Sequence, residues 1–264
     1  TTEIYTLSLH DALPIYENIA KAWQSEYDQP PVRAGLIKKE EVQHSIPAGM
    51  QAFVFNLRRP AFQDLRVREA LNLAFDFEWS NRQFAFGTYK RTQSYFANSE
   101  LASTGIPEGR ELEILQKFKG RVPEALFAQA FALPATSSSG LDIRQNLSAA
   151  RKLLEAAGWK VGKSGLLEKD GQPLRFEFLL HSDAFERWIA PMVGNLKKLG
   201  IAATMRTVDA AQYQKRLDGF DFDITVATFG QSLSPGNEQR DFWGSSKADV
   251  KGSRNLIGIK NPVV

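Results

Sequence analysis

The stretch FERWIAPMVGNLKKLGIAATMRTVDAAQYQKRLDGFDFDITVATFG, residues 185–230, decides the fold class. Residues 185–200 carry apolar side chains at helical spacing and end at a glycine, which predicts a helix. Residues 201–209 predict a strand, residues 210–219 a second helix and residues 220–230 a second strand. Because helices and strands alternate, we expect an α/β fold with a mixed or parallel sheet flanked by helices.

The residues just before this stretch continue the alternation. LSAARKLLEAA, residues 147–157, predicts a helix that either Asp142 or Asn146 caps and that the following glycine ends. We expect Trp159 to pack beneath that turn. A Lys-Asp-Gly-Gln sequence at 169–172 then predicts a hairpin that leads into an alternating strand.

The first half of the chain has weaker signals. YENIAKAWQSEY, residues 16–27, predicts a short surface helix, and MQAFVFN, residues 50–56, predicts a buried strand. DLRVREALNLAFD, residues 64–76, predicts a helix with one apolar face. Residues 84–123 mix Gly, Pro, Ser and Thr with aromatic side chains, which indicates a long loop packed by its own aromatics.

Composition narrows the class of protein. The chain has 264 residues, of which 43% are hydrophobic and 24% charged, as in a globular protein of one or two domains. It has no cysteine, which excludes disulfides and thiolate metal sites. The net charge of +3 is spread along the chain, so we expect no nucleic-acid partner. No apolar run approaches the length that spans a bilayer, so we expect no membrane-spanning segment.

Catalytic signals are sparse. His44 and His181 stand far apart, His10 lies in an unusual opening segment, and none belongs to a metal-ligand motif. The chain has no G-x-S-x-G elbow, Walker loop or G-x-G-x-x-G fingerprint. Asp221 and Asp223 form either a carboxylate pair or the edge of a half-exposed strand. We therefore expect no enzyme, no catalytic residue, no cofactor and no metal site.

Two segments have the composition of a ligand-binding surface. In TYKRTQSYF, residues 88–96, Tyr89, Arg91 and Tyr95 combine aromatic faces with a guanidinium that suits a carboxylate. The alternative is a loop that its aromatic side chains anchor. In FGQSLSPGNEQRDFWGS, residues 229–245, polar and aromatic residues follow a predicted strand. This composition is typical of a loop on a rigid sheet that meets a ligand. The alternative is a loop with a purely structural role. Its candidate ligand-binding residues are Ser232, Ser234, Asn237, Glu238, Arg240, Asp241 and Trp243.

Several segments resemble one protein family, in the family's own order. NLSAARKLLEAAGWK, GLLEKDGQPLRFEFLL and KKLGIAATMRTVDAAQYQKRLDGFDFDI resemble family 5 of the extracellular solute-binding proteins that feed ABC importers. NLRRPAFQDLRVREALNLAFD is similar to the family's segment that enters the C-terminal lobe. PAGMQAFVFNLRRP, FGTYKRTQSYFANSELASTGIPEGRELEIL and GSRNLIGIKNP resemble the branch that binds oligopeptides and microcin C-type peptide conjugates.

The resemblance implies a periplasmic binding protein-like fold of type II, in which two lobes close around a ligand. The ligand would be an extended oligopeptide or peptide conjugate, and the partner the permease of a bacterial ABC importer. A monomer in the periplasm is expected. Alternatives are a sugar or nickel-chelate binding protein of the same family, or a hydrolase on a two-lobed scaffold. Residues 16–49 would end the N-terminal lobe, 50–56 would form a hinge strand, and 57–264 would form a C-terminal lobe that is incomplete at its end.

One position departs from the family's pattern. Oligopeptide binders of this family typically hold the α-amino group of the peptide with an aspartate three residues before a proline. Counted back from Pro235, this chain has Ser232, and a neutral hydroxyl cannot replace that charge. Recognition of an amino terminus would then shift to Glu238 or Asp241, or other features would select the ligand.

The first fifteen residues, TTEIYTLSLHDALPI, differ in origin from the rest. Reverse translation of this segment matches the end of a widely used short-read sequencing adapter at every codon. We therefore expect residues 1–15 to be a non-native, disordered addition, and the biological sequence to begin at or next to Tyr16. The segment then says nothing about a signal peptide, which truncation would have removed.

Overall fold

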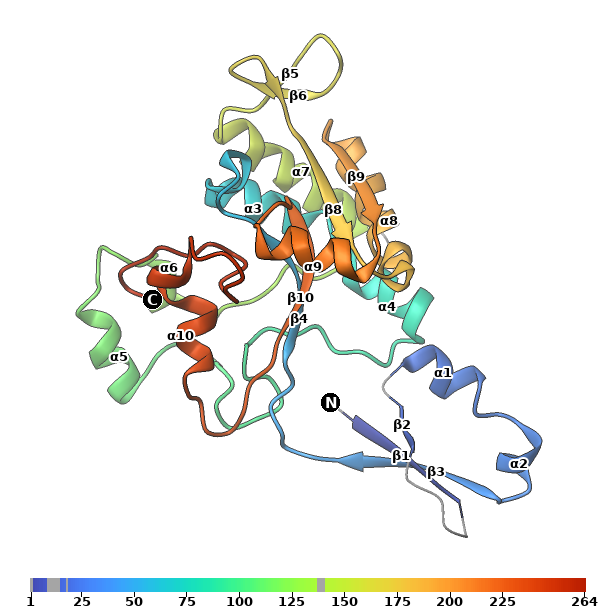
Figure 1. Cartoon of the computed structure of the whole chain (residues 1–264). Helices are drawn as coiled ribbons and strands as arrows, with labels where there is room; N and C mark the ends of the chain where they lie inside the picture. The colour runs from blue at the N-terminus through green and yellow to red at the C-terminus, as the bar shows by residue number, and fades with distance from the viewer. Residues whose placement is uncertain (1, 9–14, 18, 137–140) are drawn as a thin grey trace.

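The computed structural model describes residues 2–8, 15–17, 19–136 and 141–264. His10 lies outside these ranges. Within them the main sheet has the strand order β4-β10-β8-β9 (Figure 1). Strand β10 runs parallel to β8, and β8 parallel to β9, whereas β4 pairs antiparallel with β10. The predicted mixed sheet is confirmed. Its strands are β4 (Met50–Phe55), β8 (Arg175–Leu180), β9 (Ala202–Thr207) and β10 (Ile224–Phe229).

Helices cover both faces of this sheet. On one face, α3 (Leu65–Leu73), α7 (Leu141–Ala156) and α8 (Glu186–Lys198) enclose the largest apolar core. Alternation along β8 sends Phe176, Phe178 and Leu180 into that core. Leu179 points to the opposite face, where α9 (Ala210–Asp218) places Tyr213 against it. The Tyr213 hydroxyl lies 2.8 Å from Thr225 Oγ1, which satisfies both buried groups.

Capping residues set the helix boundaries in the main body. Asp64 accepts a hydrogen bond from the Arg66 N–H at the start of α3, and Asp209 does the same for Gln212 at the start of α9. The predicted caps of α7 are wrong, because Asp142 and Asn146 both lie inside this helix. Ile143 extends the apolar stripe one turn toward the N-terminus, so the helix begins earlier than the predicted caps.

A small antiparallel sheet follows α7. It consists of β5 (Lys160–Val161), β6 (Leu167–Lys169) and β7 (Gln172–Pro173), and the predicted Asp-Gly turn joins β6 to β7. Trp159 is buried in the main core beside the end of α7, as predicted. Short 3₁₀ turns complete the main body: η1 (Pro60–Phe62), η2 (Asp183–Phe185) and η3 (Ser245–Lys247).

The region predicted as a long loop contains regular structure. It begins in α4 (Phe77–Ala85) and includes α5 (Gly109–Gln116), and α6 (Ala125–Ala128) follows it. The loop prediction is therefore wrong for residues 109–116. Helix α5 buries none of its residues fully, and Leu112 and Leu115 are its half-buried positions. An apolar stripe this narrow gives little periodic signal.

The N-terminal part forms a separate small sheet beside the main body (Figure 1). Strand β1 (Thr2–Ser8) pairs antiparallel with β3 (Ile37–Gln43) and with β2 (Ile15–Tyr16). Residues 2–8 thus form a strand within the segment that was expected to be disordered. TEIYTLS is rich in residues with high strand propensity, which accounts for the pairing whatever its origin. The predicted helix over 16–27 is shorter, as α1 (Ala20–Ser25), and α2 (Pro30–Arg33) begins at the two prolines.

Candidate ligand-binding site

The loop after β10 lies beside the start of β4. Phe229 pairs with Met50 in the antiparallel ladder. A Cβ atom added at Gly49 would lie 3.1 Å from the Phe229 carbonyl oxygen and 3.2 Å from Gly230 Cα. Residues 230–237 therefore leave the sheet at the point where β4 enters it from the N-terminal part of the chain.

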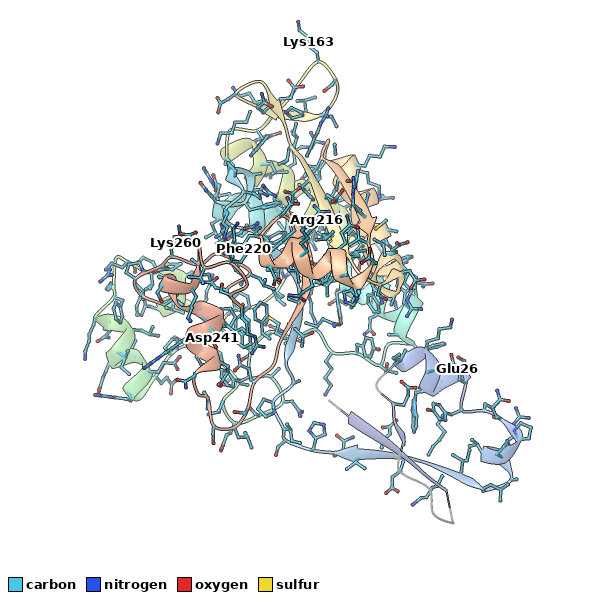
Figure 2. The ribbon with its side chains drawn as sticks, in the orientation of Figure 1. Glu26, Lys163, Arg216, Phe220, Asp241 and Lys260 are labelled. Atoms are coloured by element: carbon cyan, nitrogen blue, oxygen red, sulfur yellow. The ribbon has the colours of Figure 1, made fainter. Side chains whose placement is uncertain are left out.

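Hydrogen bonds within this loop fix its shape. Ser232 Oγ donates to the Ser234 carbonyl at 2.9 Å, and the Gly236 N–H donates to Glu238 Oε1 at 2.6 Å. Ser232, Ser234 and Asn237 are exposed. The loop then enters the short helix α10 (Glu238–Trp243), which carries the other predicted ligand residues, among them Asp241 (Figure 2).

Four aromatic side chains pack together where the loop, α10 and the 88–96 segment meet. We call Tyr95, Phe229, Phe242 and Trp243 the aromatic cluster. The Tyr95 and Trp243 ring centroids are 4.6 Å apart, and Phe229 lies 5.0 Å from Trp243. Burial raises the pKa of Tyr95. The sequence prediction named Tyr95 and Trp243 but missed Phe229 and Phe242. Two signals were available: Phe229 ends a predicted strand, and Phe242 directly precedes Trp243.

A groove of about 230 Å³ runs beside the aromatic cluster, between α9, β10 and α10. Its walls include Leu217, Ala227 and Leu256, which are apolar, and Asp218. Arg254 lines the same groove, and its guanidinium lies 4.3 Å from the centre of the Phe242 ring. Sequence reasoning missed Arg254, which lies in the GSRNLIGIKNP segment but has no motif that indicates a site.

The charged side chains of α10 are partly engaged within the chain. The hydrogen bond from the Gly236 N–H lowers the pKa of Glu238, and the nearby Arg254 charge adds to this effect. Asp241 Oδ1 lies 3.7 Å from Lys247 Nζ. Arg240 is exposed. The loop and α10 thus present carboxylates, hydroxyls, main-chain groups and aromatic faces, which suit a polar ligand with a positive group.

Tyr89 and Arg91 have contacts that fit the loop-anchoring alternative. Arg91 Nη2 donates to Asn72 Oδ1 at 2.9 Å, and Nη1 donates to the Pro134 carbonyl. Burial lowers the pKa of Arg91. The Tyr89 ring stacks on Trp188, and its hydroxyl accepts the Ala20 N–H. These two residues contact other elements than Tyr95 does, and a ligand role for them stays a prediction.

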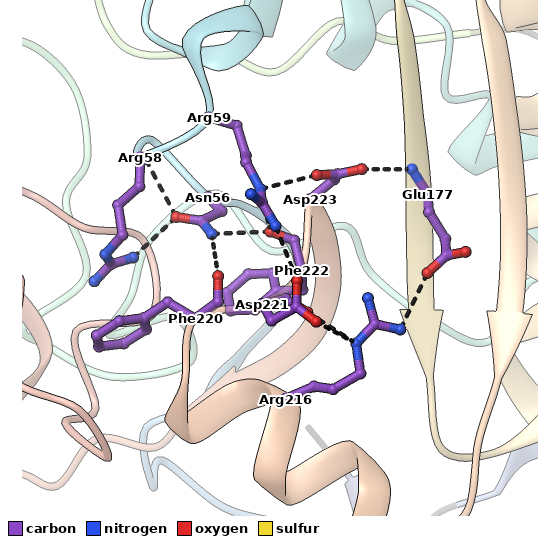
Figure 3. A network of polar contacts seen from close by, with 9 residues as sticks. All are labelled: Asn56, Arg58, Arg59, Glu177, Arg216, Phe220, Asp221, Phe222 and Asp223. Atoms are coloured by element: carbon purple, nitrogen blue, oxygen red, sulfur yellow. Dashed lines mark hydrogen bonds and ion pairs between the residues drawn. The ribbon is translucent and has the colours of Figure 1, made fainter.

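Asp221 and Asp223 belong to a chain of ion pairs at the opposite end of β10 (Figure 3). Arg59 pairs with Asp223 at 3.0 Å and with Asp221 at 3.2 Å. Arg216 then links Asp221 to Glu177, each at 3.2 Å. The two aspartates precede the strand, so placing them on its edge was wrong. Because each carboxylate has an arginine partner, this network holds the turn before β10 rather than forming a carboxylate pair.

The remaining sequence signals can also be placed. The His181 ring packs 4.7 Å from the Tyr213 ring, and the Asn98 side chain donates to the His44 carbonyl. In the described part of the chain, no group of three or more His, Asp or Glu side chains is placed to hold a metal ion. None of its helices combines the length and the apolar character needed to cross a membrane.

A mixed sheet with helices on both faces, entered by a strand from a second body, defines the chain as part of a type II periplasmic binding protein fold. Residues 12–250 match the profile of the bacterial extracellular solute-binding proteins, family 5 middle. The chain therefore belongs to this family.

Relatives support this assignment, and a solved structure shares the fold. The chain is 49% identical over 251 residues to the probable peptide-binding protein YejA of Agrobacterium fabrum, and 39% identical over 241 residues to the peptidoglycan-binding protein YepA of the same organism. The match to YejA covers 94% of this chain but 41% of YejA, so the chain spans about two fifths of that relative. The oligopeptide-binding protein AppA of Bacillus subtilis, solved with a nonapeptide, shares the fold with a TM-score of 0.57 at 24% identity, over 82% of this chain and 37% of AppA.

Proposed function

We propose that the chain is part of the substrate-binding component of an ABC importer, which captures extended oligopeptides or peptide conjugates between two lobes. It would deliver them to a membrane permease from the periplasm, as a monomer. The observation that carries the proposal is the place of the loop after β10. It begins beside the start of β4, the strand expected to connect the lobes, where Phe229 pairs with Met50 and the backbone of Gly230 lies next to Gly49. The 49% identical relative is named a probable peptide-binding protein, which supports the ligand class.

The exposed loop suits a ligand that is bound through its main chain. Residues 230–237 extend beyond the last paired residues of β10, and apart from the exposed Leu233 and Pro235 they are glycines or polar residues. An extended peptide that lies along such a segment gains main-chain hydrogen bonds, while varied ligand side chains remain solvated. The half-buried Trp243 ring would supply an apolar contact with one of those side chains.

Recognition of an amino terminus, where it occurs, would fall to Glu238 or Asp241. Both carboxylates lie on α10, one turn of helix or less from the loop that carries Ser232. We predict that Glu238→Gln combined with Asp241→Asn weakens peptide binding by at least about tenfold, since a charge-assisted hydrogen bond is worth roughly 1.5–3 kcal/mol. Titration calorimetry with trialanine against its N-acetylated form measures this, in a full-length homologue that carries the two changes. Equal affinity of the double variant and the parent would contradict the assignment.

A second candidate ligand is a peptide released from the cell wall. Ser232 leaves the loop without the usual amino-group partner, which favours ligands whose amino terminus is blocked by a sugar. The 39% identical relative is named a peptidoglycan-binding protein, which supports this class.

Thermal-shift measurements separate the ligand classes, because a ligand that binds only the folded state raises the melting temperature. The panel consists of trialanine and tetra-alanine, a muropeptide, an oligosaccharide and a nickel–histidine chelate. A shift with peptides or the muropeptide supports the proposal. A shift with only the sugar or the chelate would contradict it, and turnover of the peptides would favour the hydrolase alternative.

A further inference from the structure

Two segments that are nearly two hundred residues apart in the sequence meet at the end of β4. They are NLRRP, residues 56–60, and GSRNLIGIKNP, residues 252–262. The Leu57 N–H donates to the Ile257 carbonyl at 2.8 Å, which joins the two backbones directly. The second segment follows α10. The candidate ligand-binding site therefore lies beside the start of β4, and the chain that leaves the site returns to the other end of the same strand.

Arg58 is the centre of this junction. Its Nη1 donates to the Leu256 carbonyl at 3.0 Å and its Nη2 to the Asn255 carbonyl at 2.9 Å. Its Nε donates to the Ala248 carbonyl at 3.0 Å. The guanidinium also stacks on Phe220, 3.6 Å from the ring centre. One side chain therefore organises the carbonyl groups of three residues between 248 and 256.

Asn255 extends the junction toward α10. It is fully buried, and its Nδ2 donates to the Gly244 and Ile259 carbonyls, each at 3.1 Å. Its Oδ1 accepts the N–H groups of Gly258 and Ile259, at 2.9 and 3.0 Å. Gly244 directly follows Trp243, so Asn255 fixes the end of the helix that carries the candidate ligand residues.

Asn56 completes the junction on the side of the sheet (Figure 3). It too is fully buried. Its Nδ2 donates to the Phe220 and Phe222 carbonyls, and its Oδ1 accepts from Arg58 Nη1 at 2.9 Å. Arg58 is thereby bonded to a residue that the turn before β10 holds in place.

We propose that Arg58 is a positioning residue of the ligand-binding site, which couples strand β4 to the segment from Gly244 to Ile259 and so fixes α10 relative to the strand between the lobes. The ligand-binding part of this inference rests on the proposed function. Contacts between α10 and a ligand would then act on a rigid unit that includes β4, rather than on a helix held only by its own loop.

The planar guanidinium is what this position requires. Its donors point in fixed directions and reach carbonyls on several sides at once, whereas a lysine ammonium is a point charge on a flexible stem. Replacement of Arg58 by lysine would keep the charge but leave buried carbonyl groups without donors, and unpaired buried groups are costly. Arg59 is a matched control for the link to residues 244–259, because it is the next residue and its side chain contacts Asp221, Asp223 and the Phe222 carbonyl in the turn before β10.

Hydrogen exchange in the 264-residue chain tests the coupling. In Arg58→Lys, the amides of Leu57, Gly258 and Ile259 are expected to exchange at least about tenfold faster, while those of β8 and β9 keep their rates. Arg59→Lys should leave all of these amides unchanged. Wild-type exchange at the three amides in Arg58→Lys, or equal acceleration by Arg59→Lys, would overturn the proposal.

Gly258→Ala provides a second route to the same junction, should Arg58→Lys fail to fold. Gly258 has φ +81°, and a Cβ atom there would lie 2.9 Å from Arg58 Nη1, so alanine displaces the guanidinium without removing it. The same three amides are expected to exchange faster. Unchanged exchange in this variant would also overturn the coupling.

The ligand-binding part is tested with trialanine, by thermal shift and by Trp emission, in a full-length homologue with and without the corresponding substitution, because the chain spans about two fifths of its relative. The shift produced by wild-type protein should be lost in Arg58→Lys and kept in Arg59→Lys, with the emission change following the same pattern. A retained shift in Arg58→Lys overturns the positioning role. If no peptide shifts the wild-type protein, the proposed function fails, and hydrogen exchange still decides the coupling.

Discussion

Asp64 holds the start of α3 with both carboxylate oxygens. Oδ1 accepts the Arg66 N–H at 2.9 Å, and Oδ2 pairs with the Arg66 guanidinium at 2.6 Å. These bonds, chiefly the one to the Arg66 side chain, lower the pKa of Asp64 to about 2. A lowered carboxyl pKa stabilises the fold above the unfolded value of about 3.9, and this stabilisation is lost as the pH falls toward about 2.

We predict that Asp64→Ala lowers the free energy of unfolding by about 1 kcal/mol near neutral pH, the usual cost of a lost N-cap. The difference between wild type and variant should narrow between about pH 4 and about pH 2. Urea unfolding followed by circular dichroism at several pH values measures both effects.

Asp64→Asn is the control for charge. The amide oxygen still accepts the Arg66 N–H but carries no charge, so this variant should lose less stability than alanine and show a flatter dependence on pH. A difference between wild type and Asp64→Ala that does not change with pH would contradict the ion-pair explanation.

At the scale of elements, α8 contains one glycine and is followed by another, and the two have opposite effects on stability. Gly200 follows the helix with φ +83°, and a Cβ atom there would lie 3.0 Å from the Gly165 carbonyl oxygen. Gly194 lies inside the helix, with no atom within 4 Å of an added Cβ. We predict that Gly200→Ala destabilises by more than about 1 kcal/mol, whereas Gly194→Ala stabilises by about 0.5–1 kcal/mol.

Chemical denaturation of the two alanine variants tests the pair. Because both variants replace glycine by alanine, the substitution changes the entropy of the unfolded chain by nearly the same amount in each, and the comparison cancels this effect. Destabilisation of similar size in both variants would contradict the assigned backbone geometry at Gly200.

The elements that the sequence predicts well are those with a strong apolar period. Helices α8 and α9 and strands β9 and β10 fall within the predicted ranges. Their apolar residues recur at the period of the element, as Ala203 and Met205 do where β9 packs against the main core. Helix α5 was missed because it buries none of its residues fully. The start of α7 was misplaced because Asp142 and Asn146 are residue types that often cap the start of a helix. Side-chain identity alone does not show which of several such residues stands at the helix start.

The candidate site was predicted in part for a related reason. A loop that follows a strand can be recognised in the sequence, and this pattern predicted Trp243 and the candidate residues before it. The junction around Arg58 was not visible, because its partners Asn255 and Leu256 lie 197 and 198 residues further along the chain. For Arg91 the sequence does not separate the two interpretations, because an arginine among aromatics has the same composition whether its partner is a ligand or Asn72.

At the scale of the whole molecule, the four-stranded sheet and the N-terminal sheet share no strand pairing among the described residues. Strand β1 pairs with β2 and β3, and the three apolar clusters of the described part draw their members from residues 53–257. Contacts from the N-terminal part to the main body come from later residues, such as the Ala48 N–H to the Ala97 carbonyl at 2.7 Å.

We therefore predict that a chain beginning at Tyr16 unfolds with a main transition within about 2 °C of that of the 264-residue chain, because all four strands of the main sheet keep their pairing partners. The edge of β3 that loses its partner carries Lys38, Lys39, Glu40 and Glu41, and such charged side chains disfavour pairing with another molecule. Differential scanning calorimetry measures the transition, and a fall of several degrees would show that β1 supports the main body.

Resequencing the source locus tests the origin of residues 1–15 separately: codons contiguous with the gene in genomic DNA would make β1 a native strand, whereas their absence would leave β3 free to pair with another part of the full-length protein.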